Sequence, residues 1–101
     1  MYLAEPCDGL TPAQCGLVLG GGAELWGENV DASDVLASLW PRLGAVGERL
    51  WSPANITSLA AAEPRLAWLR CLLNQRGVAA APLLNLLSRS APPGPGSCYK
   101  Q

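Results

Sequence analysis

The sequence contains no histidine, which removes the usual ligand sets of zinc sites and the Ser-His and Cys-His pairs of nucleophilic catalysis. None of its four cysteines belongs to a Cys-x-x-Cys pair. We therefore expect no metal ion and no other cofactor in these 101 residues.

Charged residues are also scarce, at 15% of the chain against about 25% in average soluble domains. The seven basic residues are scattered and the net charge is −1, which argues against nucleic acid or an anionic membrane surface as a partner. Because half of the residues are hydrophobic and so few are charged, we expect several faces of this chain to be covered by further protein.

Targeting and membrane signals are absent from the sequence as well. No apolar run approaches the roughly 18 residues that a transmembrane helix needs, because glycine, proline and charged residues interrupt every candidate. The first residues, "MYLAEPCDGL", lack the basic and apolar regions of a signal peptide. We expect neither a membrane span nor a signal peptide within this chain.

The cysteines that are present, Cys7, Cys15, Cys71 and Cys98, could form two disulfides in any of three pairings. Asn55 begins the sequence "NIT", which is an N-glycosylation sequon. An even number of cysteines together with a sequon favours an oxidising compartment.

Periodicity and breaker residues predict one strand followed by two helices. A short apolar run predicts a buried strand over residues 17–25, and apolar residues at three-and-four spacing predict a helix over 41–51, after a turn over 33–40. A second helix follows "SPANITS", with Pro64 early in its course and Gly77 as its C-terminal cap. Trp40, Trp51 and Trp68 fall on apolar faces, so we expect them to pack in the core.

The stretch "GGGAELWGENVD" concentrates glycine, tryptophan and carboxylates. On a strand, Glu24, Trp26 and Glu28 would share one face. An indole covers the apolar face of a sugar ring and a carboxylate accepts hydrogen bonds from hydroxyl groups, so this combination is typical of sugar binding. The alternative is that Trp26 is a core residue and the carboxylates are merely solvated. Glu24 and Glu28 cannot form a glycosidase pair, because four strand residues span about 13 Å.

Three segments, "LVLGGGAELWGENVD", "LWPRLGAVGERLWS" and "RLAWLRCLLNQRGVAAAPL", together resemble the C-terminal end of the β-N-acetylhexosaminidases of glycoside hydrolase family 20, the lysosomal type. The resemblance runs from Tyr2 to Leu83. It implies an α/β fold in which residues 1–87 form the C-terminal part of a (β/α)8 TIM barrel: its last strand, its last helix and a following helix. Residues 88–101 would be a proline- and glycine-rich tail that ends near Cys98.

The resemblance also implies a function. Enzymes of this family remove terminal N-acetylglucosamine or N-acetylgalactosamine with retention, using the acetamido group of the substrate as nucleophile. Trp26 would form part of the wall around the terminal sugar ring, and Glu28 would accept hydrogen bonds from its hydroxyl groups. The Asp-Glu pair that assists catalysis lies on an earlier strand in the family and has no match here. We therefore expect no catalytic residue in this chain, and the chain alone to be inactive.

Further expectations about the whole protein follow from the same resemblance. Its partners would be N-acetylhexosamine-terminated glycans, the remainder of the barrel and a second subunit in a homo- or heterodimer. Its location would be the lysosome, the vacuole or the extracellular space. A different class of function stays open beside this one, namely a non-catalytic carbohydrate-binding or interaction remnant of the family.

The resemblance maps the last disulfide of the family onto Cys71 and Cys98. Cys7 and Cys15 have no identified counterpart in the family, and either a local disulfide or two free thiols would fit the sequence. Many relatives have glutamate at the position of Gly22 and cysteine at that of Glu24, so the polarity of the expected strand has changed. An unpaired Glu24 buried in a barrel would be costly.

Overall fold

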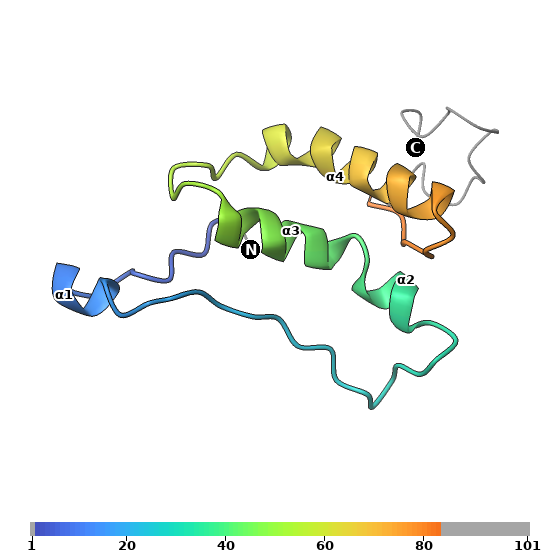
Figure 1. Ribbon diagram of the computed structural model, residues 1–101, viewed down its shortest axis with the longest axis horizontal. Helices are drawn as coiled ribbons and strands as arrows, with labels where there is room; N and C mark the ends of the chain where they lie inside the picture. The colour runs from blue at the N-terminus through green and yellow to red at the C-terminus, as the bar shows by residue number, and fades with distance from the viewer. Residues whose placement is uncertain (1, 84–101) are drawn as a thin grey trace.

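The computed structural model describes residues 2–83, which form four helices and no strand (Figure 1). The helices are α1 (Pro12–Cys15), α2 (Val35–Leu39), α3 (Arg42–Trp51) and α4 (Leu59–Gln75). The described part of the chain is therefore helical, and the α/β character expected from the sequence is not formed within it. The expected tail, residues 88–101, lies outside the described residues.

The region between the expected strand and the first long helix differs slightly from the prediction. The expected turn over residues 33–40 contains the short helix α2, and Pro41 follows it as a fully buried side chain. Helix α3 begins at Arg42, with Pro41 in the N-cap place, and ends at Trp51, so the predicted helix over 41–51 is confirmed to within one residue. Proline is favoured at this boundary because its ring already fixes a helix-compatible φ.

Helix α4 has clear signals at both ends. The Ser58 side chain caps its N-terminus by accepting a 3.3 Å hydrogen bond from the N–H of Ala61. At the other end Gly77 adopts φ +78, and the N–H of Val78 donates to the carbonyl oxygen of Leu73 at 2.9 Å, which confirms the predicted glycine cap. The helix continues through Pro64 without ending.

Helices α3 and α4 pack against each other and hold most of the small core (Figure 1). Gly44 of α3 lies so close to α4 that a Cβ atom there would overlap the side chain of Leu69. Val46 of α3 and both Ala62 and Cys71 of α4 are buried. The absence of a side chain at Gly44 thus permits the close approach of the two helices.

Polar contacts fix the N-terminal residues to this helix pair. The carboxylate of Glu48 on α3 accepts hydrogen bonds from the hydroxyl of buried Tyr2 and from the guanidinium of Arg65 on α4. Burial, reinforced by the neighbouring carboxylate of Glu48, raises the pKa of Tyr2 to about 12. The hydrogen bonds from Tyr2 and Arg65 lower the pKa of Glu48. This cluster joins three segments that are distant in sequence.

The predicted strand over residues 17–25 is wrong for the described structure. These residues run as an extended arm along α3 (Figure 1). Residues 19–30 make no hydrogen bond within the described range 2–83. Leu17 is 79% exposed and Leu19 is 98% exposed. A strand requires the N–H and C=O groups of a neighbouring strand, and residues 2–83 offer none.

The prediction that the tryptophans pack in the core is also largely wrong. Trp51 is 92% exposed and Trp68 is 50% exposed, whereas Trp40 is half-buried. In the described part of the chain, thirteen large hydrophobic residues are exposed and five hydrophobic residues are buried. Helical periodicity predicts apolar faces for these side chains, but residues 2–83 leave Trp51 and Trp68 uncovered.

Candidate functional site

The Trp-Gly-Glu motif lies at the far end of the extended arm, just before a short polar loop. Trp26 is 70% exposed, and Glu28 is exposed as well. The alternative in which Trp26 is a core residue is therefore excluded for the described structure. Both side chains that the sequence singled out for sugar binding are accessible from solvent.

The loop after Glu28 is built around two aspartates. One carboxylate oxygen of Asp31 accepts hydrogen bonds from the N–H of Ser33 at 2.7 Å and from its hydroxyl at 2.6 Å. The carboxylate of Asp34 in turn accepts from the N–H of Asp31 at 2.9 Å. The hydrogen bonds from Ser33 lower the pKa of Asp31, which keeps this carboxylate ionised. Short polar side chains hold the turn that leads into α2.

A polar hollow of about 340 Å³ is formed where the motif meets this loop. Its lining consists of Gly27, Glu28, Asn29, Val30, Asp31, Ser33 and Asp34. Three of these residues carry carboxylates, which accept hydrogen bonds and suit a ligand rich in hydroxyl groups. Sequence reasoning identified Glu28 but not Ser33 and Asp34, although Asp, Ser and Asp within the four residues 31–34 before a helix are typical of a capping turn.

The structure separates the other candidate residues of the arm. Trp26 does not line the hollow that contains Glu28. Glu24 lines a different space of about 270 Å³, together with Arg42 and Leu43 of α3 and neighbouring residues, and it remains exposed. Glu24 and Glu28 are thus in different environments.

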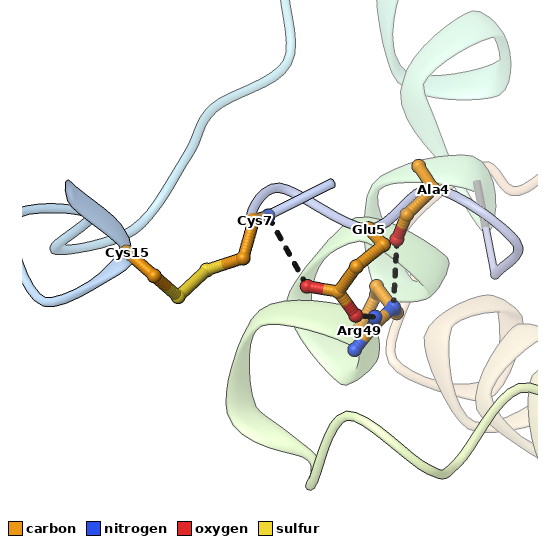
Figure 2. Close-up of polar contacts among 5 residues, drawn as sticks. All are labelled: Ala4, Glu5, Cys7, Cys15 and Arg49. Atoms are coloured by element: carbon orange, nitrogen blue, oxygen red, sulfur yellow. Dashed lines mark hydrogen bonds and ion pairs between the residues drawn. A yellow bond between two sulfur atoms is a disulfide. The ribbon is translucent and has the colours of Figure 1, made fainter. Parts of the chain in front are cut away.

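The remaining predicted sites fall elsewhere. Asn55 is exposed in the connection between α3 and α4, where it is accessible to glycosylation. Cys71 is buried in α4, and Cys98 lies outside the described residues, so their pairing stays a prediction. Cys7 and Cys15 form a disulfide, which decides the question that the sequence left open (Figure 2).

Among residues 2–83 there is no group of three or more His, Cys, Asp or Glu side chains that could hold a metal ion. In the same range no helix is long and apolar enough to cross a membrane.

Comparison with known proteins identifies the family to which this chain belongs. Residues 2–54 match the sequence model of glycosyl hydrolase family 20, catalytic domain. Beta-hexosaminidase 1 of Arabidopsis thaliana is 48% identical over 108 residues, which cover 100% of this chain and 20% of that protein. Beta-hexosaminidase subunit beta of Rattus norvegicus is 55% identical over 84 residues, covering 81% of this chain and 16% of that protein.

The chain belongs to glycosyl hydrolase family 20, whose catalytic domain is a TIM barrel. A relative from a third organism agrees with this result, because Beta-hexosaminidase subunit B2 of Dictyostelium discoideum is 43% identical over 98% of this chain. The chain spans about one fifth of the length of the curated relatives that it matches. The predicted resemblance to the hexosaminidases of this family is therefore confirmed.

Proposed function

We propose that this chain is part of a β-N-acetylhexosaminidase that removes terminal N-acetylglucosamine or N-acetylgalactosamine from glycans. The observation that carries the proposal is the 48% identity to Beta-hexosaminidase 1 of Arabidopsis thaliana along the whole chain, which includes the Trp-Gly-Glu motif. The reaction would proceed with retention, with the substrate acetamido group as nucleophile. The Asp-Glu pair that assists this group would come from protein beyond these residues.

In this proposal Trp26 and Glu28 bind the terminal sugar. Trp26 supplies an apolar ring face for the sugar C–H groups, and Glu28 accepts hydrogen bonds from the sugar hydroxyls. Their exposure at the end of the arm supports this assignment, as does the polar hollow that Glu28 lines. Asp31 and Asp34 hold the loop behind Glu28 and act as positioning residues.

The proposal also explains why the arm is extended without a partner. Residues 17–25 would become the last strand of the barrel when the remainder of the barrel pairs with their free backbone groups. The exposed side chains of Leu17 and Leu19 would be covered in that assembly. Helices α3 and α4 would then be the last barrel helix and the helix that follows it. A second subunit would complete a homo- or heterodimer.

The location of the whole protein would be the lysosome, the vacuole or the extracellular space. The Cys7–Cys15 disulfide supports an oxidising environment of this kind. The exposed sequon at Asn55 supports passage through the secretory pathway.

The test is a grafted enzyme, in which this chain replaces the aligned fifth of Beta-hexosaminidase 1 of Arabidopsis thaliana. We expect it to release a chromogenic leaving group from an N-acetyl-β-glucosaminide. Glu28→Gln should lower kcat/KM by about 10- to 100-fold, because it weakens hydrogen bonds worth about 1.5 to 3 kcal/mol in total. Glu63→Gln is the matched control, since Glu63 is exposed on α4 and should leave kcat/KM unchanged.

Three results would count against the proposal. An unchanged kcat/KM in Glu28→Gln would rule out the sugar-binding role of Glu28. Turnover by the isolated 101-residue chain, lost in Glu28→Gln, would show that the chain contains its own catalytic group. A grafted enzyme that folds but has no activity would favour the alternative, a non-catalytic carbohydrate-binding or interaction remnant. The solvent exposure of Trp26 in the described structure supports that alternative. It predicts that the isolated chain binds N-acetylglucosamine.

A further inference from the structure

The segment that precedes the arm has no core of its own. Between Glu5 and Gly16 only Cys7 and Cys15 are half-buried, and every other residue is exposed. Local backbone bonds shape the segment, among them the 3.0 Å bond from the N–H of Leu10 to the carbonyl oxygen of Cys7. Exposed hydrogen bonds of this kind stabilise a loop only weakly. The disulfide between Cys7 and Cys15 is the one covalent link that closes it.

One end of this loop is anchored on α3 through Arg49, as Figure 2 shows. The guanidinium of Arg49 donates to the carbonyl oxygen of Ala4 at 3.2 Å and forms a 3.0 Å ion pair with Glu5. The other carboxylate oxygen of Glu5 accepts from the N–H of Cys7 at 3.3 Å. The Arg49 side chain is only 9% exposed, so this anchor is shielded from water on the helix side. Cys7 therefore lies next to a segment, Ala4 and Glu5, that Arg49 holds against α3.

The other end of the loop is where the arm begins. The N–H groups of Leu17 and Val18 donate to Gln14 and Cys15 at 3.0 Å, and residues 19–30 make no hydrogen bond within the described range. Cys15 thus accepts the last backbone hydrogen bond, from Val18, before the unbonded residues that lead to Trp26 and Glu28. The path from α3 to the arm passes from Arg49 through Glu5 and Cys7 to Cys15 (Figure 2).

We propose that the Cys7–Cys15 disulfide is a reducible clasp that holds the start of the arm against α3, and that its redox state sets how firmly the arm is placed. Both cysteines are half-buried rather than enclosed, which gives a small dithiol reductant access to the sulfur atoms. The consequence for sugar binding at Trp26 and Glu28 rests on the function proposed above.

The chemistry is thiol–disulfide exchange. A thiolate of the dithiol attacks one sulfur, and a mixed disulfide forms as the other cysteine leaves and takes up a proton. The second thiolate of the reductant then displaces the first cysteine. Cys7 and Cys15 end as two thiols, having gained two electrons and two protons, and the reductant ends as a cyclic disulfide. Released from the clasp, residues 8–18 keep only exposed hydrogen bonds.

Hydrogen–deuterium exchange of the full 101-residue chain tests the clasp. The oxidised chain is compared with Cys7→Ser/Cys15→Ser under non-reducing conditions, because this variant opens the clasp without a reductant that would also act on other cysteines. We expect exchange in peptides covering residues 8–18 to become at least tenfold faster, while peptides from α3 are unchanged. Wild type treated with a dithiol should match the variant in residues 8–18.

A second variant separates the anchor from the clasp. Arg49→Ala should speed exchange at residues 4–7 and leave the disulfide intact, as peptide mapping by mass spectrometry would show. Equal exchange in the oxidised and double-serine chains would overturn the proposal, and so would an increase that is as large in α3 as in residues 8–18. A peptide map in which Cys7 and Cys15 are not joined would also overturn it. None of these readouts depends on turnover, so a failure of the proposed function is recognised separately.

Discussion

The N–H of Ala81 donates a 2.9 Å hydrogen bond to the carbonyl oxygen of Trp40, which joins the segment after α4 to the junction of α2 and α3. Helix α4 holds this returning segment from the other side. Nε of Arg70 donates to the carbonyl oxygens of Ala80 and Ala81, and the side chain of Asn74 accepts from the N–H of Ala80 at 3.2 Å. These hydrogen bonds close the segment after α4 onto the junction of α2 and α3, beside the fully buried Pro41.

Replacing Arg70 should loosen this closure. Arg70→Ala removes a charged donor from two carbonyl oxygens, and we expect the free energy of unfolding of the grafted enzyme to fall by about 1 to 3 kcal/mol. Arg76→Ala is the control, because Arg76 is exposed and should change stability by less than about 0.5 kcal/mol. Urea titration followed by tryptophan fluorescence measures both variants. Equal losses for the two would contradict the role given to Arg70.

Tyr2 should make stability depend on pH in the alkaline range. Its pKa is raised from 10.0 to about 12, so the folded state favours the protonated phenol. The stabilisation is complete below pH 10 and is lost as the pH rises towards 12, by on the order of 2 kcal/mol. Absorbance of tyrosinate measures the titration. Tyr2→Phe should remove the high-pKa component of the titration, and a normal pKa for Tyr2 would disprove the buried contact with Glu48.

The two glycines of α3 at positions 44 and 47 should respond in opposite ways to alanine. Gly47→Ala meets no atom within 4 Å and should stabilise the helix by up to about 1 kcal/mol. At Gly44 the added Cβ would meet Leu69, so Gly44→Ala should lose this gain and destabilise the helix pair by about 1 kcal/mol or more. Chemical denaturation of the grafted enzyme checks the difference, and Leu69→Ala in the Gly44→Ala background should relieve the clash. Similar effects at both glycines would show that α3 and α4 are not this close.

Asn55 should be glycosylated when the chain passes through a secretory pathway. The residue is exposed, and the 3.1 Å bond from the N–H of Thr57 to the carbonyl oxygen of Asn55 makes a local turn at the sequon. Expression of the chain behind a secretion signal, followed by endoglycosidase treatment, should give a mass decrease in wild type and none in Asn55→Gln. Thr57→Ala should behave like Asn55→Gln, because the sequon requires the hydroxyl residue. Wild type with no mass change would refute the prediction.

Local signals determined most of the helical structure from the sequence. The apolar spacing and Pro41 predicted α3 to within one residue, and Gly77 predicted the end of α4. These signals are reliable because a helix satisfies its backbone within one segment and its ends depend on a few neighbouring residues. The three motifs similarly identified the family, and Trp26 and Glu28 as its candidate sugar-binding residues, since their order along the chain is preserved whatever the packing.

Tertiary structure decided the features that depend on residues distant in the sequence. Residues 17–25 have the composition of a strand but remain an unpaired arm, because a strand is completed only by another strand. The apolar spacing predicted that Trp51 would be buried, yet it is 92% exposed because nothing among residues 2–83 covers it. The pairing of Cys7 with Cys15 required their positions in space, since spacing alone left free thiols equally compatible. The cluster of Tyr2, Glu48 and Arg65 had no sequence signal, because its members come from three separate segments.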